Sequence, residues 1–375
     1  MKKQISVLTA LLTAAAFAVT GCGASGDNAA PSASSKAASQ EVPEETEHSE
    51  VESTEAENTG AETGSEAVSE EEKEGSGASA VRVGSLKGPT SMGLAYLMET
   101  AKNGETANTY EFTMAGKADE LVGNIANGSL DIALVPANVA SVLYNKTQGQ
   151  VKVIDINTLG VLYVVASDDS ISTMEDLKGK TVYMTGKGTT PEFAMNYLLA
   201  ENGLGSGDVT MEFKSEAAEV ASILKEDPSA IGVLPQPFAS AACMQNPELK
   251  TVMDLTEQWD LLNKEGNSRM VTGVTIVRTG FLEEHEAAVE RFLKDHAESA
   301  EYTSAEPEKA AQLVADIGIV EKAAMAQKAM PLCNIVCITG EEMKQALSGY
   351  LEVLSGQDAK SIGGTLPGDD FYYLP

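Results

Sequence analysis

Two short turns in the sequence bring glycines and hydroxyl side chains together, and each turn follows an apolar run. The first is Lys87-Gly88-Pro89-Thr90 and the second is Lys187-Gly188-Thr189-Thr190. Glycine lets the backbone approach a ligand closely, while hydroxyls and the free amides at the start of a helix bind polar or anionic groups. One such turn is typical of a helix cap, but two at matched positions favour a ligand-binding cleft. The predicted contacts are Ser85, Gly88, Thr90, Ser91, Gly188, Thr189 and Thr190.

Five further residues lie beside or beyond these turns and have side chains that suit a small ligand. Asn138 and Gln236 follow the prolines that end two apolar runs, and their amides could form hydrogen bonds with a ligand. Met92 and Phe238 offer packing surface, and Arg269 could pair with a carboxylate or sulfonate. Capping, core packing or a surface ion pair would also explain each of these residues.

Motifs of catalysis are missing from the sequence. It has no His-Glu-x-x-His helix and no Gly-x-Ser-x-Gly turn, and Gly179-Lys180-Thr181 lacks the earlier glycine of a phosphate-binding loop. His285 and His296 fall among glutamates on an expected helix, which predicts solvent-exposed positions. Cys333 and Cys337 have no second pair and no histidine near them in sequence, so we expect buried apolar side chains rather than a disulfide or a metal site. We therefore predict no catalytic residue, no metal and no cofactor.

The elements that must position these residues alternate between strand and helix. Apolar and alternating runs predict strands at 81–86, 110–114, 131–135 and 151–156. Helices are expected at about 91–102, 118–126 and 138–144 between and after them, and at 287–302, 307–317 and 340–354 further on. The segment 366–373 is expected to be irregular. Strands that alternate with helices indicate parallel βαβ units and an α/β fold.

The same order of landmarks recurs about one hundred residues later. Leu134-Val135-Pro136 corresponds to Val233-Leu234-Pro235, and Val153-Ile154-Asp155 corresponds to Val252-Met253-Asp254. A repeat of this length predicts two similarly built lobes with a cleft between them. The apolar strands at 159–165 and 271–277 are expected to carry the chain between the lobes. The predicted lobes are 80–164 plus 269–375, and 165–268.

The N-terminus indicates export. Lys2 and Lys3 precede an apolar run too short to span a membrane, and Val19-Thr20-Gly21-Cys22 resembles a bacterial lipobox. Residues 1–21 are therefore a predicted signal peptide, with lipidation at Cys22 holding the chain at the outer face of the cell membrane. Residues 22–79 contain fifteen acidic residues against two lysines and almost nothing to bury, which predicts a disordered tether. The net charge of −30 argues against nucleic-acid binding.

Three segments together resemble ABC-transporter substrate-binding lipoproteins of the nitrate, sulfonate, taurine and thiamine-precursor group. They are Gly84-Ser85-Leu86-Lys87-Gly88-Pro89-Thr90, Leu130-Asp131-Ile132-Ala133-Leu134-Val135-Pro136 and Met174-Glu175-Asp176-Leu177-Lys178-Gly179-Lys180-Thr181-Val182. The resemblance covers about residues 81–360 and implies a type 2 periplasmic-binding fold, a bilobal clamp. It further implies that the chain hands a small molecule to an ABC importer permease. We expect the chain to act as a monomer.

The resemblance leaves the ligand and two other functions open. The acidic chain should repel a free anion at long range, so a neutral pyrimidine-like ligand competes with sulfonates and carboxylates as the expected occupant. A non-transport sensor or surface interaction protein could use the same clamp. Pyrimidine-precursor synthases share the fold but use a histidine as a reactant together with a cysteine-rich iron site, and neither is evident here.

Overall fold

The computed structural model describes residues 80–375. The predicted signal peptide 1–21, lipidation site Cys22 and tether 22–79 lie outside the described residues. Among the helices of the described part, none is both long and apolar enough to cross a membrane.

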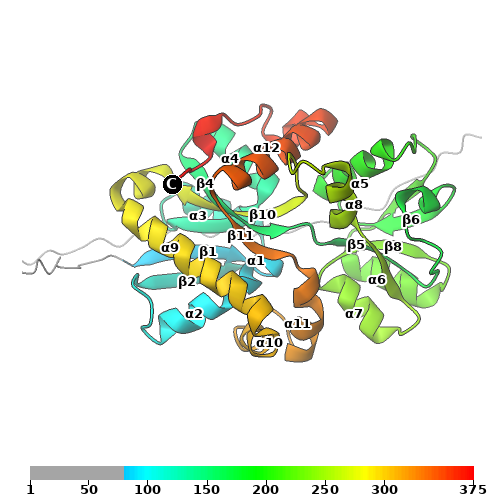
Figure 1. Ribbon diagram of the computed structural model, residues 1–375, viewed down its shortest axis with the longest axis horizontal. Helices are drawn as coiled ribbons and strands as arrows, with labels where there is room; N and C mark the ends of the chain where they lie inside the picture. The colour runs from blue at the N-terminus through cyan, green and yellow to red at the C-terminus, as the bar shows by residue number, and fades with distance from the viewer. Residues whose placement is uncertain (1–79) are drawn as a thin grey trace, which may run out of the picture. The chain divides into compact units, whose positions relative to one another are not determined.

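The first sheet has six strands in the order β2-β1-β3-β10-β4-β11 (Figure 1). β1, β2 and β3 are parallel, and β10 runs antiparallel to both of its neighbours, β3 and β4. The strands are β1 Val81–Leu86, β2 Tyr110–Ala115, β3 Ile132–Pro136, β4 Val151–Leu159, β10 Val271–Arg278 and β11 Ile335–Ile338.

Helices cover both faces of this sheet because its central strands, such as β3 and β4, are buried on both sides. In β3, Ile132 and Leu134 pack in the cluster that contains helices α2 and α9, while Ala133 and Val135 pack in the cluster that contains α3 and α4. The apolar side chains of α3 that meet the sheet, Leu121 and Ile125, are four residues apart and so share one helix face. The covering helices are α2 Ala95–Lys102, α9 Thr279–Ala305, α3 Ala118–Ala126, α4 Ala137–Thr147 and α12 Gly340–Gln357.

The second sheet has five strands in the order β7-β6-β8-β5-β9. They are β5 Leu162–Ala166, β6 Thr181–Met184, β7 Thr210–Phe213, β8 Ile231–Pro235 and β9 Lys250–Asp254. Helices α6 and α7 pack against one face and α5 and α8 against the other. Their bounds are α5 Thr190–Glu201, α6 Ala217–Glu226, α7 Phe238–Gln245 and α8 Leu255–Leu262.

The five strands of the second sheet repeat the order of five strands in the first, which supports the hundred-residue repeat and confirms the α/β fold. β2-β1-β3 corresponds to β7-β6-β8, and β4 corresponds to β9. Each sheet has one antiparallel strand between these groups, β10 in the first and β5 in the second. The predicted landmarks fall at equivalent places, since Pro136 ends β3 and Pro235 ends β8.

The chain changes sheet at two connections. It passes from β4 through Gly160 and Val161 into β5, and it returns from α8 through residues 263–270 into β10. The segment expected to cross at 159–165 does contain the first connection, at Gly160 and Val161. The strand expected to cross at 271–277 does not, because it is β10 and lies inside the first sheet. The expected boundary between residues 164 and 165 falls within β5, whose partners β8 and β9 both belong to the second sheet.

Two predicted helices also differ from the structure. The helix expected at 91–102 is two helices, α1 Pro89–Met92 and α2, which are separated at Gly93 and Leu94. Pro89 occupies the start of α1, where a helix tolerates the loss of an amide donor. The helix expected at 287–302 begins earlier, at Thr279, and bends at His285, whose φ of −137° is not helical. The remaining helices are α10 Pro307–Asp316 and α11 Ala323–Ala329.

Contacts on two sides join the strands and helices of the two sheets. On one side Trp259 of α8 lies edge-on against Tyr350 of α12, with 5.4 Å between ring centroids. On the other side the Tyr163 hydroxyl of β5 donates a hydrogen bond of 2.8 Å to the carbonyl of Leu332, which follows α11. Near the first connection, the Asn334 amide donates to the carbonyl of Gly160 at 2.6 Å.

Candidate functional site

The turn after β1 is closed by its own hydroxyl groups. Thr90 donates from Oγ1 to the carbonyl of Leu86 at 2.7 Å, and Ser91 Oγ lies 2.7 Å from both Ser85 Oγ and the same carbonyl. All three hydroxyl side chains are buried. Gly88 has a φ of 133°, a conformation that side chains other than glycine rarely adopt. These bonds hold the turn rigid and leave a ligand little hydroxyl hydrogen-bonding capacity.

The equivalent turn after β6 is exposed and has an acidic partner. The Gly188 amide donates to the carboxylate of Glu192 at 2.5 Å, and Thr189 Oγ1 donates to the carbonyl of Gly186 at 2.7 Å. Thr190 begins α5. Glu192 thus occupies the position that the sequence analysis assigned to an anionic ligand, and an anion could bind here only by displacing it.

Other predicted contacts also have internal partners. Asn138 donates from Nδ2 to the carbonyl of Ser361 at 3.3 Å, and Arg269 Nη2 lies 3.5 Å from Asp260 Oδ2. Met92 is fully buried, in an apolar cluster with residues of α10 and α11. In this conformation Asn138 caps a backbone carbonyl, Arg269 forms an ion pair and Met92 packs in the core. These are the alternative roles that the sequence left open for them.

Gln236 differs from the other predicted contacts because half of its amide has no partner. It follows the carboxyl end of β8 and is 3% exposed. Its Oε1 accepts a hydrogen bond from the Ser240 amide at 3.3 Å, while Nε2 is buried without a hydrogen-bond partner. An unpaired buried donor costs free energy, which an acceptor on a ligand would recover.

The two residues that follow Gln236 in the sequence, Pro237 and Phe238, line a cavity of about 1080 Å³. Helices α6 and α7 of the second sheet form one wall, the end of α10 and the start of α11 form another, and Lys87 reaches it from the turn after β1. Phe238, 43% exposed, is the one predicted site residue that lines it. Besides Lys87, six polar lining residues were not predicted from the sequence: Lys225, Lys322, Glu321, Ser222, Gln245 and Asn246.

The lining of this cavity is positive although the chain is strongly acidic. Lys87, Lys225 and Lys322 face a single carboxylate, Glu321, whereas the whole chain has a net charge of −30. None of these three lysines forms an ion pair with another described residue. Ammonium groups at the wall would attract a small anion at short range, where the charge of the distant surface is screened.

The prediction that His296 is exposed was wrong. Its side chain is fully buried on α9, and Nδ1 lies 3.1 Å from Oδ2 of the equally buried Asp155 on β4. The glutamates around it lie on the other face of the helix, so their proximity in sequence was misleading. His285 falls at the bend of the same helix.

The cysteines Cys243, Cys333 and Cys337 are all free. Burial raises the pKa of the Cys333 thiol to about 12. The pKa of the Cys337 thiol is also raised, mainly by burial and to a smaller extent by the nearby Asp155 carboxylate. The premise that no histidine lies near Cys337 holds only in the sequence, because the fold brings it close to His296.

The doubled α/β topology and the cavity beside it define a class, the bilobal substrate-binding proteins of membrane importers. Residues 95–319 match the family described as ABC transporter, phosphonate, periplasmic substrate-binding protein. The chain therefore belongs to that family, which confirms the resemblance found in the sequence. A protein of Brucella abortus and one of Brucella suis, each named only as a binding protein, are 25% identical over 251 residues, covering 64% of this chain and 70% of each relative.

Solved structures share the fold at lower identity. An ABC transporter protein from Parabacteroides distasonis has a TM-score of 0.66 at 23% identity, covering 78% of this chain and 98% of that chain. The periplasmic aliphatic sulphonate binding protein SsuA from Escherichia coli has a TM-score of 0.61 at 16% identity, covering 79% and 92%. The periplasmic nitrate-binding protein NrtA from Synechocystis has a TM-score of 0.50 at 12% identity, covering 78% and 83%. The periplasmic-binding-protein-like fold follows from these matches.

Proposed function

We propose that this substrate-binding protein captures a small organic anion in the cavity beside Phe238 and delivers it to an ABC importer permease. The observation that carries the proposal is the set of three lysines, Lys87, Lys225 and Lys322, around that cavity. Phosphonates and sulfonates fit best, because a compact anionic head can reach the ammonium groups while an apolar part packs on Phe238 and the alanines of α6 and α7. The names of the family and of the sulphonate-binding neighbour support the same ligand class.

In this proposal the same ligand binds both the cavity lysines, which have no ion pair, and the unpaired Nε2 donor of Gln236. Pro237 and Phe238 line the cavity, and Gln236 directly precedes them with a buried Nε2 donor. A ligand oxygen that accepts from Nε2 would recover the free energy lost by the unpaired amide, about 1–3 kcal/mol. The opposite walls come from helices of the second sheet and from α10 and α11, so a bound ligand would draw them together.

Calorimetric titration with alkylphosphonates, alkanesulfonates, nitrate and uncharged analogues of the same size tests the proposal. We expect binding of one anion class, an affinity that falls as ionic strength rises, and no binding of the uncharged analogues. Lys87→Gln and Lys322→Gln should each weaken binding by about three- to tenfold, since about 1.4 kcal/mol corresponds to tenfold. Lys328→Gln is the matched control for Lys322→Gln. Lys328 lies in α11, which Lys322 precedes, but it does not line the cavity. Equal weakening by all three variants would contradict the assignment of the cavity.

We further propose that the mature protein is attached to the membrane by a lipid on Cys22, with residues 22–79 as the tether between lipid and folded part. The apolar run that ends in Val-Thr-Gly-Cys supports this. A tethered binding protein stays near its permease, which raises their effective concentration.

A further inference from the structure

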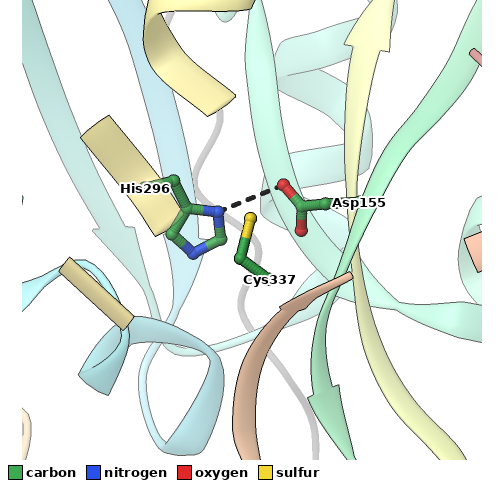
Figure 2. A group of neighbouring side chains, drawn as sticks. All are labelled: Asp155, His296 and Cys337. Atoms are coloured by element: carbon green, nitrogen blue, oxygen red, sulfur yellow. Dashed lines mark hydrogen bonds and ion pairs between the residues drawn. The ribbon is translucent and has the colours of Figure 1, made fainter. Parts of the chain in front are cut away.

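Three side chains that are far apart in the sequence meet between the first sheet and α9. They are Asp155 on β4, His296 on α9 and Cys337 on β11. One ligand atom from each, a carboxylate oxygen, an imidazole nitrogen and the thiol sulfur, lies within 4.8 Å of the other two. Figure 2 shows the three side chains pointing toward one another, with the sulfur beside the ring nitrogen that bonds the carboxylate.

An irregularity in the sheet aims Asp155 at α9. Thr275 pairs with Asp155 and the next residue, Ile276, pairs with Val153, so β4 has one extra residue at this point. Such a bulge turns two successive side chains toward the same face. Ile154 packs with residues of α9, and Asp155 contacts His296 of the same helix. Thr275 donates from Oγ1 to Asp155 Oδ1 at 2.7 Å and fixes the carboxylate.

Among the described residues, His296 is the one basic side chain that pairs with Asp155. Asp155 is completely buried, and among the described residues no lysine or arginine pairs with it. His296 Nε2 is also buried and has no hydrogen-bond partner. Burying a carboxylate is costly because the interior solvates charge poorly, so this group gains from any cation placed beside it. Nδ1 is the ring nitrogen that faces both the Asp155 carboxylate and the Cys337 sulfur.

We propose that Asp155, His296 and Cys337 form a binding site for a divalent transition-metal ion of the Zn²⁺ type. Nitrogen, oxygen and thiolate sulfur together are the donors that Zn²⁺ prefers, and hard ions such as Mg²⁺ would not choose a thiol. On binding, the thiol loses its proton to solvent and the sulfur bonds the metal. Aspartate, thiolate and neutral imidazole then balance the two positive charges of the ion.

The geometry needs only a small contraction to reach this state. Zinc ligands lie about 2.0–2.3 Å from the ion, so pairs of them are separated by roughly 3–4 Å. The Nδ1 to Oδ2 distance of 3.1 Å already falls in this range. The second-shell bond from Thr275 to Asp155 is of the kind that orients metal-bound carboxylates.

The place of the site in the fold gives it a structural role. β4 leads directly into Gly160, where the chain changes sheet, and Asn334, just before β11, holds the carbonyl of Gly160. An ion joining β4, β11 and α9 would therefore stiffen the root of the first connection. The cavity lysines are not part of this cluster, so metal binding and anion binding are separable.

Titration of the reduced, chelator-treated mature chain with Co²⁺ tests the proposal, in a Cys22→Ser background that removes the N-terminal thiol. We expect one equivalent to produce a thiolate-to-cobalt absorption band together with tetrahedral d–d bands, and Zn²⁺ to abolish both by displacement. Zn²⁺ should also raise the melting temperature. Cys337→Ser should remove the thiolate band, and Asp155→Asn and His296→Gln should weaken binding at least about tenfold.

Controls separate this site from other thiols and from general damage. Cys333→Ser removes a buried thiol outside the cluster, and His285→Gln alters a histidine outside it. Both variants should keep the thiolate band. Cobalt bound without a thiolate band in the folded wild type, or a band that survives in Cys337→Ser, would overturn the proposal. Circular dichroism and anion binding identify any variant that fails to fold, and in that case the cobalt spectrum of the wild type decides.

Discussion

Asp131 and Arg278 are 147 residues apart in the sequence, yet Oδ1 of the carboxylate lies 2.7 Å from Nη2 of the guanidinium. A second arginine, Arg82, donates to the same carboxylate from its backbone amide, from Nε at 2.9 Å and from Nη2 at 2.5 Å. The carboxylate is almost fully buried, and the two arginines are about one-third exposed. Asp131 therefore connects β1, β3 and β10, the centre of the first sheet.

Replacing Asp131 by Asn should lower the free energy of unfolding by about 2 kcal/mol, because it leaves the guanidinium groups without their counter-charge. Burial raises the pKa of the Asp131 carboxyl, but the hydrogen bonds from Arg82 and Arg278 more than offset this and lower it overall. The stabilisation is therefore complete above the unfolded pKa of about 3.9 and is lost as pH falls through the lower folded pKa. Urea unfolding from pH 3 to 7 measures it, with the exposed Glu105→Gln as a control that should change little.

Gly349 of α12 touches the return connection and should not tolerate a side chain. A Cβ at this position would lie 2.0 Å from the backbone carbonyl oxygen of Asn267, between α8 and β10. Gly349→Ala should therefore lower the melting temperature by several degrees, as expected for about 1–3 kcal/mol of overpacking. Gly356→Ala, in the same helix with open space around its Cβ, should be neutral or stabilising. Equal melting temperatures for the two variants would contradict the close packing of α12 on this connection.

The order of strands and helices could be predicted because the apolar residues have clear periods. Short apolar runs ending at Pro136 and Pro235 marked equivalent strands, and the similarity of the two halves followed. The roles of β5 and β10 could not be predicted in the same way. Both are rich in apolar β-branched residues, and such a run fits an internal strand of either sheet as well as a crossing strand.

The candidate site was only partly predictable because distant segments form it. Phe238 followed from its place after β8, but Lys322 belongs to the loop between α10 and α11, where no pattern marks it. His296 was misjudged because glutamates near it in sequence lie on the other face of α9. Its partners Asp155 and Cys337 are 141 and 41 residues away, and a bulge that the sequence does not reveal turns Asp155 toward it.

Gln236 allows a test that separates ligand binding from stability. Gln236→Met removes the unpartnered Nε2 donor together with one weak hydrogen bond, from the Ser240 amide at 3.3 Å. These losses oppose each other, so the free energy of unfolding without ligand should change by less than about 1 kcal/mol. Affinity for the anion should nevertheless fall at least about fivefold, which calorimetry measures. Unchanged affinity with altered stability would mean that Gln236 has only a structural role.

Cys22→Ala tests the proposed lipid anchor. Lipidation replaces the free thiol with acyl chains, and each buried CH₂ contributes about 0.8 kcal/mol of membrane binding. Without the cysteine there is nothing to acylate, so the variant should move from the membrane fraction to the soluble fraction or retain its signal peptide. Detergent partitioning and intact-mass measurement distinguish the two results. Cys243→Ala, which alters a cysteine of the folded part, should partition like the wild type.

Removing the tether completes this test, because attachment and binding should be independent. A chain that starts near Ala80 contains every described element from β1 onward and all residues of the cavity. We therefore expect it to melt within about 2 °C of the full mature chain, since the acidic segment has little apolar surface to contribute to a core. Its anion affinity should also match. A wild-type chain with an unmodified Cys22 would refute the lipid anchor, and a large loss of stability on truncation would show that the acidic segment packs on the folded part.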